Sequence, residues 1–172
     1  RYFAATLGFF ILSIAALINL NRSYNSNIKT LSIVLLIWVL VQGAFGYLTV
    51  SLKLWPQIVS LHLLFGFITT ALLWLLYFKL VDEDIGLADQ WRFTKSLRSL
   101  ISFASVIVFL QIFLGAWTST NYAAFSCTDF PLCQGRAFPN MNFLGGFNLF
   151  QDIGPNYLGG QMDLESRTAI HF

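Results

Sequence analysis

The sequence predicts an all-α polytopic membrane protein, a helix bundle of four transmembrane helices followed by the start of a fifth. The first observation is composition: 56% of the 172 residues are hydrophobic and only 10% are charged, whereas a soluble domain carries about 25% charged residues. The second is a set of uncharged runs, each long enough to cross the hydrocarbon core, which takes roughly 20 helical residues. These runs are Tyr2–Asn21, Thr30–Leu52, Leu54–Phe78 and Ser99–Thr128.

The number and length of these runs disfavour the alternative of buried helices in a soluble protein. The formal net charge of +2 is also too small to indicate a nucleic-acid partner or an acidic one.

Each run predicts one helix, and the polar residues between the runs set its ends. Pro56 suits the first turn of the third helix, because the missing N–H costs no hydrogen bond there. The expected helices span about Tyr2 to Leu20, Thr30 to Ser51, Gln57 to Phe78 and Ser99 to Thr118, and another begins near Thr168.

The distribution of basic residues predicts the orientation. The connections 21–29 and 79–98 share one side and hold six Lys or Arg, whereas the other side holds four. Because basic residues concentrate in cytoplasmic loops, we expect the first side to face the cytoplasm.

The two ends of the chain suggest a piece of a longer protein. The first residue is Arg1 rather than Met, and the final residues, from Thr168 to Phe172, resemble the opening turn of a further helix. We therefore expect an internal fragment, from which no signal peptide can be assessed.

Both cysteines lie in one long polar loop, residues 119–167, on the side opposite the cytoplasm. Five residues separate Cys127 from Cys133, which does not fit a Cys-x-x-Cys redox motif, and a zinc site needs more ligands. A loop-closing disulfide is the simplest interpretation, since disulfides persist on the oxidising side of a membrane. The carboxylates of this loop show no acid–base spacing, and we expect them to be solvated; they are Asp129, Asp152, Asp163 and Glu165.

A short pattern recurs in two of the predicted helices. Gln42-x3-Gly46-x2-Thr49 is repeated as Gln111-x3-Gly115-x2-Thr118. Small residues let helices approach closely in lipid, and Gln or Thr can hydrogen-bond across the interface. The repeat supports related helical units. The alternative is a chance match, because apolar segments use few residue types.

The chain has two histidines, and His62 lies inside the third predicted helix, near its outer end. Ionisable residues within spanning segments usually face the interior of the bundle. Imidazole is the common axial ligand of haem, so two interpretations stay open: a haem ligand, or a structural histidine hydrogen-bonded to a neighbouring helix.

The segment from Gln111 to Gly135 resembles one family. It combines an apolar helix end, Gly-Ala-Trp-Thr-Ser-Thr-Asn-Tyr-Ala-Ala, with Ser-Cys-Thr-Asp-Phe-Pro-Leu-Cys-Gln-Gly. This combination is similar to the haem A synthases, membrane enzymes of cytochrome oxidase assembly. The family has two similar four-helix halves. The resemblance therefore makes residues 1–80 three helices of the first half, 81–98 a cytoplasmic loop, and 99–172 the start of the second half with its outer Cys loop at 119–167.

The resemblance also implies site residues. The family places haem-ligating histidines at the outer ends of its even-numbered helices, which makes His62 an axial ligand of the haem iron. The second helix of the family opens with Glu-x-x-His-Arg, and Arg1 matches that Arg. His171 is either a ligand itself or stands one turn before a ligand that lies beyond the chain. Arg1 and Arg167 are candidates to meet haem propionates, while no catalytic residue is indicated.

The implied reaction is the oxidation of a ring methyl of haem O to the formyl group of haem A, with a second haem, haem b, passing electrons. The runner-up is a non-catalytic membrane cytochrome exchanging electrons with quinone, and a third interpretation is a helical interaction protein without a cofactor. The resemblance implies the lipid bilayer, a haem substrate, and haem O synthase or oxidase assembly factors as partners. It places the protein in the bacterial plasma membrane or the mitochondrial inner membrane.

Overall fold

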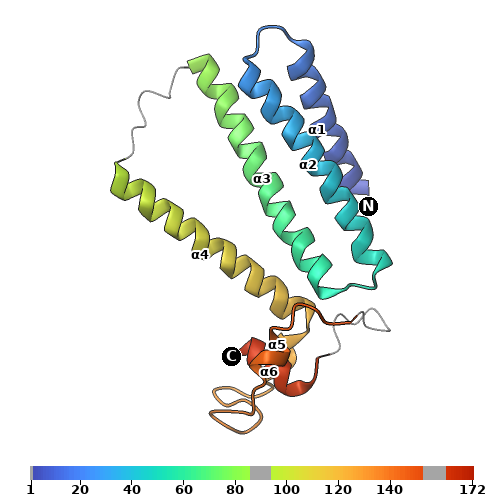
Figure 1. Cartoon of the computed structure of the whole chain (residues 1–172), viewed down its shortest axis with the longest axis vertical. Helices are drawn as coiled ribbons and strands as arrows, with labels where there is room; N and C mark the ends of the chain where they lie inside the picture. Colours follow the sequence, from blue (N-terminus) through green and yellow to red (C-terminus); the bar gives the residue numbers. More distant parts are fainter. Residues whose placement is uncertain (1, 86–93, 153–161) are drawn as a thin grey trace. The chain divides into compact units, whose positions relative to one another are not determined.

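A computed structural model describes residues 2–85, 94–152 and 162–172, with only the backbone described over 82–85. Regular structure within these ranges is entirely helical. Figure 1 shows the long helices first and the short ones after them along the chain. In chain order the elements are α1 (Tyr2–Leu20), α2 (Ser26–Ser51), α3 (Pro56–Ile85), α4 (Lys95–Thr120), the 3₁₀ turn η2 (Ala123–Phe125), α5 (Phe143–Gly146) and α6 (Leu164–His171).

The predicted fold class is confirmed, whereas several predicted helix ends are wrong by a few residues. Polar caps move the starts toward the N-terminus, because a side-chain oxygen can accept from an otherwise unsatisfied N–H of the first turn. Thr94 Oγ1 accepts from Leu97 N at 3.3 Å, so α4 begins at Lys95 rather than near Ser99. Asp163 caps α6 in the same way, and that helix begins at Leu164 rather than near Thr168. The end of α3 shows that charged residues do not stop a helix, since it continues to Ile85.

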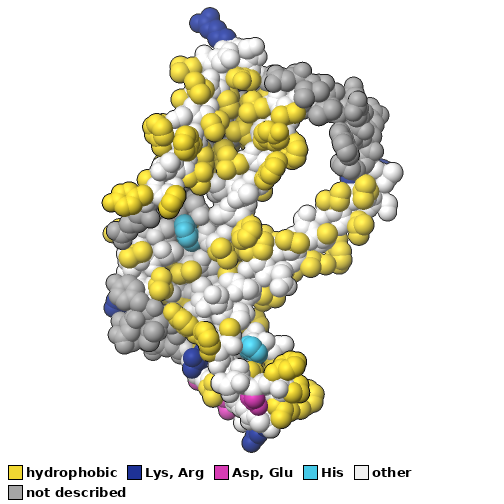
Figure 2. Space-filling view, turned by 180° about the vertical axis from the view of Figure 1, so that it is seen from behind, with side chains coloured by type: hydrophobic (Ala, Val, Ile, Leu, Met, Phe, Trp, Pro, Cys, Tyr) yellow, Lys and Arg dark blue, Asp and Glu magenta, His cyan; other side chains and the backbone are white. Residues whose placement is uncertain are grey.

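Within the described ranges, four helices are long and apolar enough to cross a membrane: α1, α2, α3 up to Val81, and α4. The 18-residue stretch searched in each helix has a mean hydropathy between 2.0 and 2.2. Large apolar side chains on them are exposed, such as Phe103 at 64% and Leu40 at 66%. In the face seen in Figure 2, hydrophobic side chains cover most of the helical surface and charged ones are few. A soluble monomer rarely exposes so much apolar surface, so lipid is the solvent that this surface fits.

The chain divides into two compact units, and the first contains residues 1–44 and 65–101. Its core joins α1, α2 and α3 through five buried aliphatic side chains: Ile11, Ile18, Ile28, Leu35 and Leu76. Ile11 and Ile18 are seven residues apart on α1, as are Ile28 and Leu35 on α2. Each of these two helices therefore presents one face to its neighbours over two turns.

Polar contacts inside this unit tie the helices together. Asn19 Nδ2 donates to Ser32 Oγ at 2.9 Å, which links α1 to α2. Trp38 Nε1 donates to the carbonyl of Phe65 at 3.2 Å, and the two rings meet edge to face at 4.9 Å, which links α2 to α3. Hydrogen bonds between helices matter here because hydrocarbon offers no alternative partner.

The second unit contains residues 45–64 and 102–172. It is built from the end of α2, the start of α3, most of α4 and everything that follows in the chain. Within it, Figure 1 shows α5 and α6 gathered at the C-terminal end of α4.

Leu35→Ala tests the core of the first unit. Leu35 is 1% exposed, and the truncation leaves a cavity whose lining loses its packing contacts. We expect a loss of about 2 kcal/mol, at the low end of the range for soluble cores, because the hydrophobic term between helices is weak in lipid. The measurement is unfolding by sodium dodecyl sulfate, followed by circular dichroism. Leu40→Ala on the exposed face of α2 is the matched control, and equal losses for the two variants would contradict this core.

Candidate functional site

His62 is the seventh residue of α3, which places it roughly 9 Å along the helix axis from Pro56. Its side chain is half-buried. The imidazole lies on the backbone of α2 at Gly46: a Cβ built there would be 3.1 Å from Cε1 and 3.5 Å from Nε2 of His62. The second unit therefore holds this ring where α2 ends and α3 begins.

Residues 149–151 form a hydrogen-bonded strap against the start of α3. Trp55 Nε1 donates to the carbonyl of Gln151 at 2.8 Å, and Gln57 Nε2 donates to the carbonyl of Leu149 at 2.9 Å. The Gln151 side chain continues to α4, because its Nε2 donates to Asn121 Oδ1 at 3.0 Å. Asn121 in turn donates to the carbonyl of Trp117 at 2.9 Å. The loop segment 149–151 thus joins the start of α3 to the end of α4.

The strap is dry. Asn121 is 2% exposed and Gln151 is 8% exposed. Ser60, two residues before His62, is 1% exposed, and its Oγ lies 3.5 Å from Thr120 Oγ1. Buried polar groups are costly unless they are paired, so these contacts fix the ends of α3 and α4 relative to each other.

Trp117 is the anchor of the short helices. Its side chain is 1% exposed, and Nε1 donates to the carbonyl of Gly146 at 2.9 Å. Gly146 packs against α6: a Cβ there would lie 2.7 Å from the carbonyl oxygen of Ser166. A side chain at position 146 would therefore separate α5 from α6.

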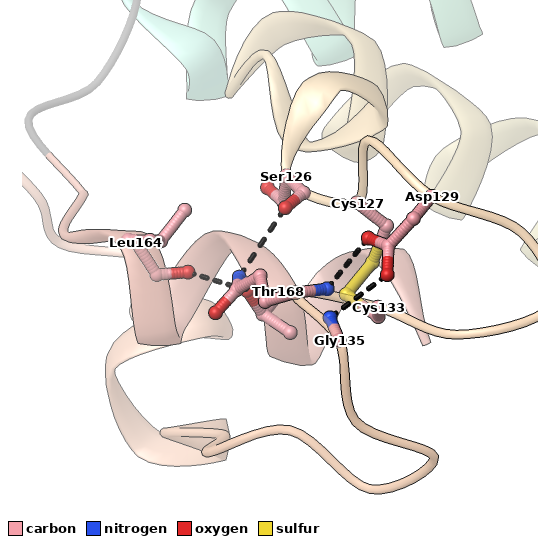
Figure 3. The surroundings of a disulfide bond; sticks show 8 residues. Ser126, Cys127, Asp129, Cys133, Gly135, Leu164 and Thr168 are labelled. Atoms are coloured by element: carbon pink, nitrogen blue, oxygen red, sulfur yellow. Dashed lines mark hydrogen bonds between the residues drawn. A yellow bond between two sulfur atoms is a disulfide. The ribbon is translucent and has the colours of Figure 1, made fainter.

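Residues 127–135 of the cysteine loop form a compact turn closed by the two cysteines, which we call the clasp (Figure 3). Cys127 and Cys133 are bonded through their sulfurs, with Cα atoms 4.7 Å apart. The Asp129 carboxylate accepts from the backbone N–H groups of Gln134 at 2.7 Å and Gly135 at 2.8 Å. Gly135 has a φ of 71° in a tight turn, a conformation that favours glycine. The carboxylate predicted to be solvated thus has a structural role.

Gln134 connects this clasp to α6. Its Nε2 donates to Thr168 Oγ1 at 3.0 Å and to the carbonyl of Ser126 at 3.2 Å; Figure 3 labels both of these partners. Thr168 is fully buried. The loop therefore fixes the position of the helix that carries His171.

The predicted site residues occupy different elements. His62 lies in α3, and His171 is exposed at the last residue of α6. Arg167, one turn before His171 on the same side of α6, is half-buried. Arg1 lies outside the described residues. The cysteine pair is brought together, whereas formation of its bond in the cell, like the role of each histidine, stays a prediction.

Several residues of the site were not found by sequence reasoning. Trp55, Trp117, Asn121 and Gln151 carried no local signal, because their partners lie far away in the chain. One signal was available: Asp163 followed by an amphipathic stretch is a common helix start, and Asp163 does accept from Ser166 N at 3.2 Å.

The residues fit a haem better than a bare metal ion. Across the described ranges, no group of three or more His, Cys, Asp or Glu side chains is placed to hold a metal ion. A haem iron takes its equatorial ligands from the porphyrin, so a single imidazole from one helix suffices as an axial ligand. His62, half-buried against Gly46 of α2, has the side-chain chemistry for that role.

Four helices of membrane-spanning length, with a polar strap of buried side chains at the start of α3, define a polytopic membrane protein. Residues 1–162 match a family described as cytochrome oxidase assembly protein, and the chain belongs to that family. It is 37% identical over 174 residues to heme A synthase of Shewanella oneidensis, covering 99% of this chain and 50% of the relative. It is 28% identical to heme A synthase of Symbiobacterium thermophilum, over 84% of this chain and 49% of the relative. The chain thus spans about half the length of these relatives, and no solved structure matches it.

Asn121→Ala tests the strap. The change leaves the buried amide of Gln151 without its acceptor, and we expect a loss of about 1–3 kcal/mol in resistance to unfolding. Cleavage within residues 142–152 by a soluble protease should also accelerate. Asn140→Ala, at an exposed position of the same loop, is the control, and an unchanged cleavage rate in Asn121→Ala would contradict the strap.

The disulfide is tested by alkylation. Unreduced protein should gain no alkyl mass at Cys127 or Cys133, and reduced protein should gain two adducts. After reduction, a membrane-impermeant maleimide should label intact cells or right-side-out vesicles but not the cytoplasmic face. Because the closed loop is short, replacing both cysteines with serine should cost no more than about 2 kcal/mol. Free labelling of both thiols before reduction would refute the prediction.

Proposed function

We propose that the protein to which this chain belongs oxidises a ring methyl group of haem O to the formyl group of haem A, for the assembly of cytochrome oxidase. The single observation that carries this proposal is the match over 99% of the chain to a protein named heme A synthase. The names of the other relatives agree. They favour this function over the runner-up, a non-catalytic membrane cytochrome.

His62 is the axial ligand in this proposal. A neutral imidazole binds iron through one ring nitrogen and avoids the cost of a charge inside the membrane. When bound, the haem iron supplies the redox chemistry, and a second haem, haem b, carries electrons away. The part of the chain is to hold the haem, orient its axial ligand and limit the access of water.

The strap supports the exclusion of water. It closes over the start of α3, where Pro56 and Ser60 are buried between the outer end and His62. Asn121 and Gln151, which it joins by a hydrogen bond, are both buried, and burial lowers the local dielectric. A dry site stabilises reactive species against side reactions with water.

The membrane orientation follows from the basic residues. With the connections 21–29 and 79–98 in the cytoplasm, His62, the strap and the cysteine clasp all belong to the outer side of a bacterial plasma membrane or the mitochondrial inner membrane. The clasp then meets the oxidising compartment that its disulfide requires. Residues 1–80 and 99–172 contribute to two similar halves in this arrangement, joined by the cytoplasmic connection 81–98.

The remaining candidates are His171 and Arg167 in the second half and Arg1 in the first. His171 is a ligand or stands one turn before one, and Arg167 and Arg1 pair with propionates. Arg167 suits this role because its Nε is buried and forms no hydrogen bond with any described residue. Haem O synthase or oxidase assembly factors are the protein partners that would deliver the substrate or receive the product.

His62→Ala in the full-length protein is the decisive variant. We expect the optical spectrum of one haem to disappear or shift and haem A formation to be abolished, because no other side chain at this place in α3 can ligate iron. The measurements are reduced-minus-oxidised spectra of purified protein and chromatography of extracted haems from cells that also make haem O.

Leu63→Ala, on the exposed side of the same helical turn, is the matched control and should preserve both spectrum and product. Normal haem A production with an unchanged spectrum in His62→Ala protein would sink the ligand assignment. His62 would then be a residue that hydrogen-bonds between helices.

A further inference from the structure

One glycine of α2 stands apart from its neighbours in what surrounds it. At Gly46 a Cβ would be 3.1 Å from Cε1 of His62, closer than side chains normally approach, whereas at Gly43 and Gly115 a Cβ would meet nothing within 4 Å. The imidazole of His62 therefore lies close to the place that a side chain at position 46 would occupy.

We propose that Gly46 is a positioning residue that sets the orientation of the His62 ring and, through it, the ligation of the haem. The inference rests on the proposed function for its second half. It concerns a residue that touches the ligand rather than the reacting atoms.

The contact falls on the chemically important edge of the ring. Of the ring atoms near position 46, Cε1 and Nε2 are closest and Nδ1 is farther away, at 3.9 Å. Groups that contact a ligating imidazole set its orientation and tune the metal. A methyl group at position 46 would press on the edge that contains Nε2 and turn the ring about its χ angles.

Gly46 lies inside the continuous helix α2, where Thr49 Oγ1 donates to its carbonyl at 2.7 Å. The imidazole must yield by a few tenths of an ångström when alanine is introduced, and by more for a β-branched residue. Alanine has the higher helix propensity, so α2 itself should not be weakened.

The first experiment uses full-length protein with bound haem. Low-temperature electron paramagnetic resonance of the oxidised haem reports the orientation of its axial ligand. We expect Gly46→Ala to shift the g values of the signal that His62→Ala removes, and Gly46→Val to diminish that signal. Gly43→Ala and Gly43→Val, on the same helix, should leave it unchanged.

The second experiment needs no haem. In haem-free protein carrying ¹³Cε1-labelled histidine, the resonance lost in His62→Gln identifies His62. Gly46→Ala should move this resonance, and Gly43→Ala should not.

The combined results separate three failures. An unmoved resonance in Gly46→Ala overturns the contact, and a moved resonance with unchanged g values overturns the positioning role. A moved resonance in protein that never binds haem overturns the proposed function instead, and with it the haem half of this inference.

Discussion

The structure depends on the absence of hydrogen-bonding partners in hydrocarbon. Every backbone N–H and C=O in the spanning segments must be paired within the chain, which leaves helices as the available solution. The same constraint acts on polar side chains, so Asn19 finds Ser32 and Trp38 finds a carbonyl on the next helix. These polar side chains pair between neighbouring helices, and the exposed apolar side chains form the surface for lipid.

At the end of the helices that carries the strap and the clasp, the constraint relaxes, and the chain uses polar groups more freely. Two tryptophans with distant partners organise this region: Trp55 binds the loop through Gln151, and Trp117 binds it through Gly146. An indole donates a single hydrogen bond from a large apolar body, which suits a boundary between lipid and water. Long loops are usually variable connections, but this one, through the strap and the clasp, fixes α6 and the ends of two spanning helices.

The spanning helices were predictable from sequence because their signal is local: length and lack of charge suffice. Their ends were less predictable, since α2 starts at Ser26 and α3 continues to Ile85 by backbone hydrogen bonding that composition does not report. His62 could be selected because an ionisable residue in a spanning run is unusual. Its contact with Gly46 could not, because the repeated Gln-x3-Gly-x2-Thr pattern looks equivalent in α2 and α4, while only the first glycine meets a ring. Partnership across helices is a property of the fold.

The close fit between one ring and one glycine also bears on how such a protein can change over evolutionary time. Selection at position 46 acts on a pair, so a larger residue there becomes acceptable only after the imidazole at position 62 has been lost or moved. Position 43, one turn away, has no such contact, so it can vary among residues that are compatible with lipid. Among descendants of this sequence, diversity at position 46 would therefore mark lineages in which the imidazole at position 62 has been lost or moved.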